Sequence, residues 1–162
     1  MFEKERPLYM VDDRMFRKAM SQFATGITVV TSVHEGNVIG MTVNAFMSIS
    51  LQPKIVAVSI GEQAAMYNLL PQTNKFGVSF LRNDQQDISQ LFASEDEYGN
   101  QEMFTYKKGI PVLKDCLTHL TCHVVESTKV GDHLIFFGEV NDLEIFAGDP
   151  ILYYGSDYRT IE

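Results

Sequence analysis

Residues 36–61 carry the most informative pattern of apolar and polar positions in this chain. Two apolar runs typical of β-strands flank a segment in which short polar side chains recur at even positions. Residues two apart in an extended chain point to the same face, so Thr42, Asn44, Ser48 and Ser50 are expected to share one face of a strand. Short uncharged donors and acceptors suit a polar, planar ligand lying against the backbone. From spacing alone, the plainer interpretation is an ordinary half-buried strand whose Ser and Thr side chains lie on its solvent-exposed side.

A helical stripe precedes this segment. Apolar residues between 14 and 24 recur at the spacing of one helix face, and an aspartate at 12 or 13 supplies the N-cap and complements the helix dipole. Gly26 follows as a stop signal. The pattern predicts a helix over 14–24 that packs on the core through Met15, Phe16, Ala19, Met20 and Phe23.

The remaining periodicity predicts a mostly β chain. β-type runs are expected at 27–33, 54–60, 75–81, 117–128, 133–146 and 151–154, and further helices at 63–70, which Pro71 stops, and 84–92. Residues 94–109 are polar and acidic and are expected to form a mobile loop. Because the three helices do not alternate with the six or seven strands, the pattern favours a mostly antiparallel barrel with packed helices over a Rossmann layout. No Gly-x-Gly-x-x-Gly or P-loop occurs.

Length and charge narrow the class. A chain of 162 residues is expected to form a single domain over 1–162, with 1–11 as an N-terminal extension. No apolar run has the length of a membrane span, and the charged N-terminus lacks a signal-peptide core, so a cytoplasmic location is the default. The net charge of −8 argues against a nucleic-acid partner. It also means that an anionic cofactor would be held largely by backbone N–H groups.

Few side chains form a recognisable catalytic motif. Cys116 and Cys122 lack the partners of a zinc or iron–sulfur site and are interpreted as two small buried residues, so no metal is expected. His133 follows a Gly-Asp turn at a strand entrance; it either contacts a ligand or hydrogen-bonds Asp132 in the turn. Tyr residues gather near Arg159 at the C-terminus, where they can stack on a planar cofactor or serve as core or interface.

Several short segments, in order, resemble the short-chain flavin reductases, most closely those that supply phenol and 4-hydroxyphenylacetate hydroxylases. The resemblance runs from about residue 12 to the C-terminus. The matching segments are Phe16–Thr31, Gly40–Leu51, Pro53–Lys54, Val58–Gly61, Leu91–Ala93, Gly131–His133, Gly138–Val140 and Asp149–Pro150.

This resemblance implies a homodimeric split-barrel oxidoreductase that uses NADH or NADPH to reduce FMN or FAD and passes reduced flavin to a separate aromatic monooxygenase. It implies that no residue acts as acid or base, and that His133, Tyr154, Tyr158 and Arg159 border the nicotinamide. The flavin would be held by Met41, Thr42, Val43, Asn44, Ala45, Ser48, Ser59, Ile60, Gly61, Gln63, Ala64 and Ala65.

The chain departs from many family members in the segment expected to bind the flavin phosphate, which we call the phosphate end of the site. Residues 63–66 read Gln-Ala-Ala-Met, where relatives carry Ser, Thr or Arg. Phosphate binding would then use N–H groups at the start of the following helix, with Lys54 or Lys75, and the choice between FMN and FAD stays open. Two alternatives are a non-catalytic flavin-binding protein, a sensor or electron carrier, and a pyridoxamine-phosphate-oxidase-like enzyme. The latter calls for a stronger basic phosphate cluster than this acidic chain shows.

Overall fold

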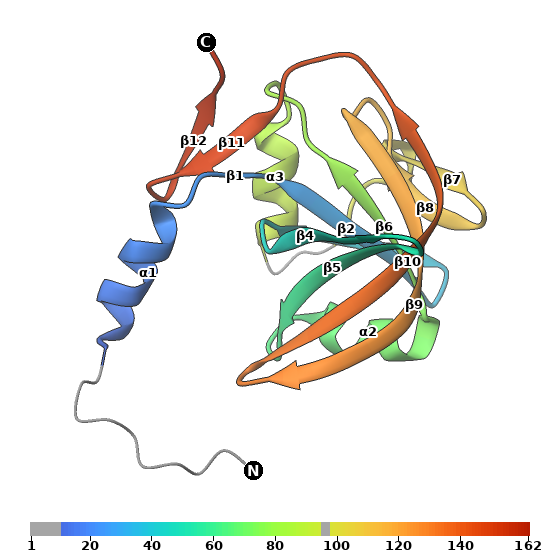
Figure 1. Ribbon diagram of the computed structural model, residues 1–162. Coiled ribbons are helices and arrows are strands. Elements are labelled where there is room, and N and C mark those ends of the chain that lie inside the picture. Colours follow the sequence, from blue (N-terminus) through green and yellow to red (C-terminus); the bar gives the residue numbers. More distant parts are fainter. Residues whose placement is uncertain (1–10, 95–97) are drawn as a thin grey trace.

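The computed structural model describes residues 11–94 and 98–162, and most of its regular structure is β-strand (Figure 1). The largest sheet has seven strands in the order β3-β2-β6-β9-β10-β5-β4, and every neighbouring pair is antiparallel. Its strands are β2 (Thr28–His34), β3 (Asn37–Val43), β4 (Phe46–Leu51), β5 (Lys54–Gly61), β6 (Lys75–Phe80), β9 (Thr118–Val130) and β10 (His133–Ile145).

Two small sheets and three α-helices complete the described fold, which confirms the predicted mostly-β class with a few helices. One sheet joins β1 (Thr25–Gly26), β11 (Ile151–Tyr154) and β12 (Asp157–Thr160), and the other is the hairpin of β7 (Phe104–Lys107) and β8 (Ile110–Leu113). The helices are α1 (Asp13–Ser21), α2 (Ala65–Thr73) and α3 (Gln86–Ala93), with a 3-10 turn η1 at Gln101–Met103.

Strand β2 separates two hydrophobic cores. Successive side chains of a strand point to opposite faces, and Val29 and Val30, both fully buried, belong to different clusters. The Val30 cluster is closed by α2 and includes Phe76 and Phe136. The Val29 cluster is closed by α3 through Phe92. Burial on both faces explains why 27–33 contains no charged residue.

Helix α1 begins as predicted but does not pack on the core. The Asp12 carboxylate accepts a hydrogen bond from the Arg14 N–H at 2.8 Å, which is the expected N-cap. The helix has no buried residue, and Figure 1 shows it projecting from the sheets. The prediction of a core-packing helix is therefore wrong for the single chain, because its apolar stripe faces away from both clusters. The exposed side chains are Met15, Phe16, Met20 and, beyond the helix end, Phe23.

Three further features differ from the prediction. Pro71 lies inside α2, which continues to Thr73 and ends at Asn74 in a left-handed conformation, with the Asn74 N–H donating to the Leu70 carbonyl. Leu69 and Leu70 are buried, and the stability gained from their packing outweighs the loss of the hydrogen bond that proline cannot donate.

The segment 94–109 was expected to be a loop, but it contains η1 and β7; residues 95–97 lie outside the described chain. The C-terminal strand β12 was also missed.

Candidate functional site

The polar segment 42–50 is not one extended strand. Strand β3 ends at Val43 and β4 begins at Phe46, so Asn44 and Ala45 form the connection, and the pairing of β4 with β5 shifts register between Ser48 and Ser50. The register shift places Ser48 and Ser50 on opposite faces of β4. The prediction that four polar residues share one face is therefore wrong.

Four hydrogen bonds hold the β3–β4 connection in place. The Thr28 hydroxyl donates to the Val43 carbonyl at 2.6 Å, and the Thr42 hydroxyl donates to the carbonyl of Ser89, on α3, at 2.7 Å. The Phe46 N–H donates to the Asn44 carbonyl at 2.9 Å. The Ser59 N–H, on β5, donates to the Ala45 carbonyl at 3.1 Å. The connection is thus pinned by three neighbouring elements, which limits the rearrangement needed to receive a ligand.

A shallow trough of small residues runs beside this connection. On β5, Ala57, Ser59 and Gly61 point to one face, and with Ala45 they form what we call the small-residue trough. Strand β10 places Ile135 opposite Ser59 and His133 opposite Gly61. A cavity of about 330 Å³ lies here, within the range of small-molecule sites. It is lined by Met20, Phe23, Thr25, Asn44, Ala45, Phe46, Met47, Ala57, Ser59 and Ile135.

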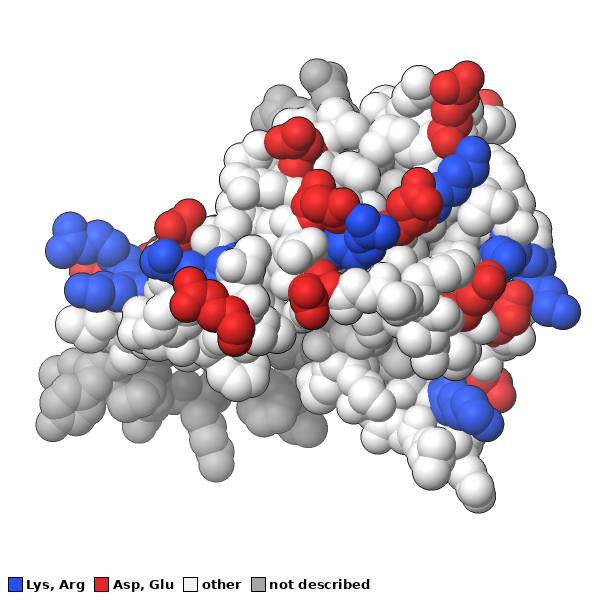
Figure 2. All heavy atoms as spheres, turned by 90° about the horizontal axis from the view of Figure 1, so that it is seen from above, with Lys and Arg blue, Asp and Glu red and all other residues white. Residues whose placement is uncertain are grey.

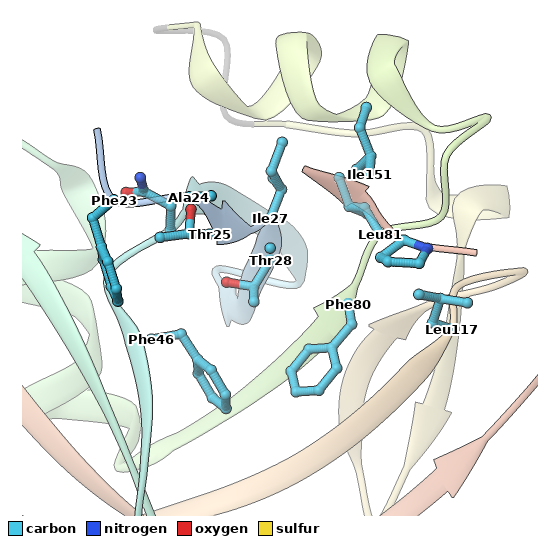
Figure 3. A pocket seen from close by; sticks show the side chains of 13 residues that line it. Phe23, Ala24, Thr25, Ile27, Thr28, Phe46, Phe80, Leu81, Leu117 and Ile151 are labelled. Atoms are coloured by element: carbon cyan, nitrogen blue, oxygen red, sulfur yellow. The ribbon is translucent and has the colours of Figure 1, made fainter. Parts of the chain in front are cut away.

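A second cavity, of about 360 Å³, lies on the other side of Phe23 and Phe46 (Figure 3). Phe46 and Phe80 close one side of it with ring centroids 5.1 Å apart, edge to face. Figure 3 places Ile27, Leu81 and Ile151 on the side toward α3. The cavity is largely apolar, as expected of a surface that receives a flat ring. Its remaining lining residues are Ala24, Thr25, Gly26, Thr28, Asn44, Leu117 and Pro150.

A third cavity, of about 190 Å³, lies beside Thr42, Ser89 and Tyr158. Asn44 lines this cavity and both of the cavities described above. Near it, the Thr25 hydroxyl oxygen is shielded from solvent and has no hydrogen-bond partner among the described residues. Such hydroxyls are uncommon in folded proteins.

The structure separates the predicted flavin residues by where their side chains lie. Asn44, Ala45 and Ser59 line the trough cavity, and Thr42 lines the third cavity. Met41, Val43, Ile60 and Ala64 pack in or against the core, so a ligand contact from them would come from the backbone. Ser48 is exposed on β4, Gly61 ends β5, and Gln63 and Ala65 are exposed next to the start of α2.

His133 lies at the end of the trough and is bonded within its own turn. Its Nδ1 is 2.7 Å from an Asp132 carboxylate oxygen, and this hydrogen bond is the main reason that the pKa of Asp132 is lowered. A Cβ added at Gly61 would lie 3.5 Å from His133 Nε2, so the imidazole is directly beside Gly61. The hydrogen bond to Asp132 confirms the turn interpretation. A ligand contact through Nε2 stays a prediction.

The predicted C-terminal contacts are tied to other elements. The Tyr158 hydroxyl is 3.0 Å from the Ser89 hydroxyl on α3. The Tyr154 hydroxyl donates to the Gln22 side chain at 3.4 Å, and the Arg159 guanidinium lies 3.6 Å from the Asp157 carboxylate. Tyr158 lines the third cavity, next to Asn44.

Neither predicted lysine is placed at the expected phosphate end. Lys54 begins β5 and Gly61 ends it, which separates them by about 23 Å. Lys75 follows the C-terminal end of α2, whereas the N–H groups are at its beginning. Lys129 was missed by the sequence analysis: its Nζ lies 3.9 Å from the Glu62 carboxylate, one residue beyond Gly61. The hairpin pairing of β9 with β10 brings it there, and local sequence contains no signal of that contact.

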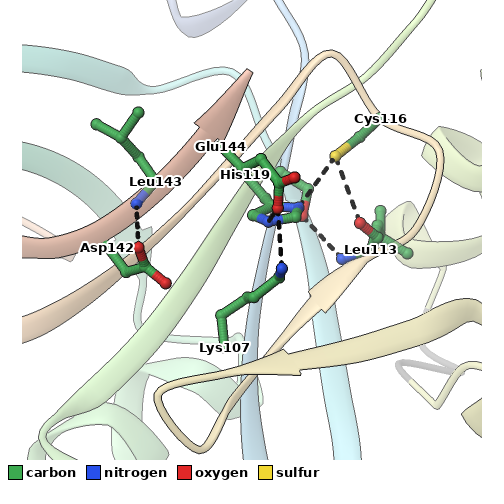
Figure 4. A network of polar contacts seen from close by, with 8 residues as sticks. Lys107, Leu113, Cys116, His119, Asp142, Leu143 and Glu144 are labelled. Atoms are coloured by element: carbon green, nitrogen blue, oxygen red, sulfur yellow. Dashed lines mark hydrogen bonds and ion pairs between the residues drawn. The ribbon is translucent and has the colours of Figure 1, made fainter. Parts of the chain in front are cut away.

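A second polar cluster, around His119, is structural (Figure 4). His119 is 3% exposed; its Nδ1 lies 3.9 Å from Cys116 Sγ and its Nε2 lies 3.4 Å from Glu144. Lys107, on β7, donates to Glu144 at 2.9 Å. Burial raises the pKa of the Cys116 thiol, which makes it a poor nucleophile. The cluster therefore ties the β7–β8 hairpin to β9 and β10, and the prediction that both cysteines are buried is confirmed.

On the face in Figure 2, acidic and basic side chains are interspersed among large uncharged areas. Within the described residues, no three His, Cys, Asp or Glu side chains are grouped to hold a metal ion. No described helix is long and apolar enough to cross a membrane.

Comparison with known proteins assigns a family to this arrangement. The family described as "Flavin reductase like domain" matches residues 20–162. An NADH-dependent flavin reductase from a Rhodococcus species is 39% identical over 149 residues, covering 90% of this chain and 85% of the relative. The reductase component of 4-hydroxyphenylacetate 3-monooxygenase from Thermus thermophilus is 34% identical over 147 residues, covering 90% of this chain and 95% of the relative.

A solved structure agrees with the fold. The NADH:FAD oxidoreductase SgcE6 of Streptomyces globisporus, in complex with NAD and FAD fragments, superimposes with a TM-score of 0.88 at 31% identity. The match covers 95% of this chain and 97% of that chain.

Proposed function

The chain belongs to the flavin reductase-like domain family, and from this premise we propose that it transfers a hydride from NADH to FMN or FAD. We further propose that the reduced flavin leaves for a separate aromatic monooxygenase, as the Thermus relative's name describes for its own system. The relatives with assigned activities favour this over a flavin-binding protein without turnover. The match over 20–162 supports the proposal of a single domain, and the assignment of 1–11 as an extension stays a prediction.

The observation that carries the proposal is the small-residue trough beside a pinned backbone. Ala45, Ala57 and Ser59 line a cavity of about 330 Å³, and Phe23 and Met20 contribute apolar surface to it. A flat ring system needs such a slot, with small residues on one side and large apolar groups on the other. The flavin ring, when bound, accepts the hydride and the negative charge that comes with it.

The residues of the chain would bind and orient the two ligands and exclude water. Preorganised backbone N–H groups stabilise developing charge without rearranging, and the connection at Asn44–Ala45 is held by its four hydrogen bonds. We propose that His133 Nε2, which lies beside Gly61, contacts a nicotinamide at the end of the trough. No acid or base is required, because a hydride carries its own electron pair between the two rings.

At the phosphate end of the site, α2 and Lys129 support the proposal that a flavin phosphate binds there. Helix α2 begins at Ala65 without a side-chain cap and with no acidic residue in its first turn, so its N–H groups suit an anion. Lys129 offsets the negative charge of Glu62 near this end of the site. This arrangement replaces the expected contribution of Lys54 and Lys75.

We also propose that the protein is a cytoplasmic homodimer. Large apolar side chains of α1, β4 and the end of β10 are exposed in the single chain, and α1 has no buried residue. A second copy that covers α1 would bury the stripe that the sequence pattern marks as apolar. The availability of NADH in the cytoplasm supports the proposed location. The exposed residues are Met15, Phe16, Met20, Phe23, Met47, Ile49, Leu51, Leu143, Ile145 and Phe146.

Steady-state NADH oxidation with added flavin tests the function. Purified protein should consume NADH in proportion to added FMN or FAD, and the ratio of kcat/KM values ranks the two flavins. The same assay with NADPH ranks the two nicotinamides. Protein that binds flavin without accelerating NADH oxidation would support the non-catalytic alternative instead.

A further inference from the structure

The C-terminal hairpin of β11 and β12 is connected to the proposed flavin site through one buried serine. Tyr158, on β12, packs edge to face against Tyr153 with ring centroids 5.7 Å apart, and its hydroxyl is 3.0 Å from the Ser89 hydroxyl. Ser89 is 1% exposed on α3. The Tyr158 hydroxyl therefore already has a protein partner.

Ser89 joins the hairpin to the end of β3. Its hydroxyl interacts with Tyr158, and its carbonyl accepts the Thr42 hydroxyl at 2.7 Å. Thr42 is two residues before Asn44, and the next carbonyl, that of Val43, is held by Thr28. Asn44 lines all three cavities of the site. A series of contacts therefore runs from Tyr158 through Ser89 and Thr42 to the end of the strand that precedes Asn44.

The same hairpin also holds the segment that supplies the apolar wall of the trough. The Gly155 N–H, at the hairpin turn, donates to the Ser21 carbonyl at the end of α1 at 2.8 Å. Strand β11 pairs with β1, placing Tyr153 opposite Thr25. Met20 and Phe23 lie directly before that strand and line the trough cavity. The hairpin therefore contacts both sides of the proposed flavin slot.

We propose that Ser89 and Tyr158 are positioning residues for flavin binding, which act by fixing Asn44 through Thr42 rather than by touching the nicotinamide. This inference rests on the proposed function, because it assigns the cavities at Asn44 to the flavin. One net hydrogen bond limits the size of the effect to about 2- to 10-fold in flavin affinity. The chemical step is not affected, since neither hydroxyl meets the transferred hydride.

A double-mutant cycle tests the inference. Tyr158→Phe and Ser89→Ala should each raise flavin Kd and flavin KM by about 3- to 10-fold, with kcat and NADH KM within twofold. The double variant should be no weaker than the weaker single variant, because both changes break the same contact. Ser89→Thr keeps the hydroxyl, and its added methyl has space in the cavity of about 190 Å³, so it should bind flavin like the wild type. Tyr106→Phe, at an exposed position on β7, is the matched control.

The outcomes separate this inference from the proposed function. A rise in NADH KM alone on Tyr158→Phe would assign Tyr158 to the nicotinamide and overturn the inference. Additive effects in the double variant, or a lower Tm with unchanged flavin KM, would overturn it as well. Wild-type protein that neither binds flavin nor consumes NADH would overturn the proposed function, and this inference with it. Should Ser89→Ala fail to fold, Tyr158→Phe compared with Tyr106→Phe still decides, because Tyr158 is only half-buried.

Discussion

Filling the small-residue trough should weaken flavin binding strongly, and Ala45→Trp is the most direct way to fill it. Ala45 is exposed beside the cavity of about 330 Å³, and its carbonyl is already held by the Ser59 N–H. An indole at this position would occupy the slot between Ser59 and Phe23. Because Ala45 is outside both hydrophobic cores, the substitution should leave the fold intact.

The magnitude follows from the contact that the indole would remove. A buried aromatic ring covers about 150–250 Å², worth about 4–6 kcal/mol at 25 cal/mol per Å². Losing half of that contact is about 2–3 kcal/mol, or roughly a 100-fold weaker flavin Kd. Flavin fluorescence titration measures this directly, and NADH oxidation at saturating flavin shows whether turnover falls with it.

Two controls make the result interpretable. Ala45→Gly keeps the slot open and should change flavin Kd by less than threefold. Val125→Trp places the same side chain at an exposed position of β9, outside the cavities described above, and should have no effect. Unchanged flavin affinity and NADH oxidation in Ala45→Trp would refute the placement of the flavin in the trough.

Three further predictions concern packing. Thr31→Val should lower the free energy of unfolding by about 1–3 kcal/mol, because it leaves the buried Pro111 carbonyl without its hydroxyl donor. Thr25→Val removes a hydroxyl without a described partner and should leave the free energy of unfolding unchanged or raise it. Denaturant titration measures both effects. Burial raises the pKa of Cys122 to about 12, so iodoacetamide at pH 8 should label it only in denaturant; rapid labelling of the native protein would contradict its burial. Phe16→Asp should convert the dimer to monomers in sedimentation, because each copy loses about 1.5–3 kcal/mol of apolar burial, whereas Arg17→Asp, at the adjacent position of α1, should not.

Local sequence predicts the elements of this protein better than their packing. The N-cap at Asp12 and the central strand at 27–33 follow from residue types alone. The apolar stripe of α1 correctly predicted a helix, but no local pattern says whether its partner is the same chain or a second copy. Pro71 failed as a stop signal because the burial of Leu69 and Leu70 is decided by tertiary packing.

In the candidate site, too, local sequence predicted the residues better than their arrangement. Asn44, Ala45 and Ser59 were identified in sequence and do meet at one cavity. Their geometry was wrong, because alternation was assumed to continue through a connection and a register shift. Lys129 could not be found, since it approaches Glu62 only through the pairing of β9 with β10. Contacts between distant strands are set by topology, which periodicity does not encode.

The central claim is that this chain moves a hydride from NADH to flavin, and anaerobic single-turnover reduction tests it most directly. Mixing the protein and FAD or FMN with NADH in the absence of oxygen should bleach the visible absorption of the oxidised flavin. The rate should saturate with NADH and slow when the transferred hydrogen is deuterium. Flavin that bleaches no faster with protein than without it would contradict the account.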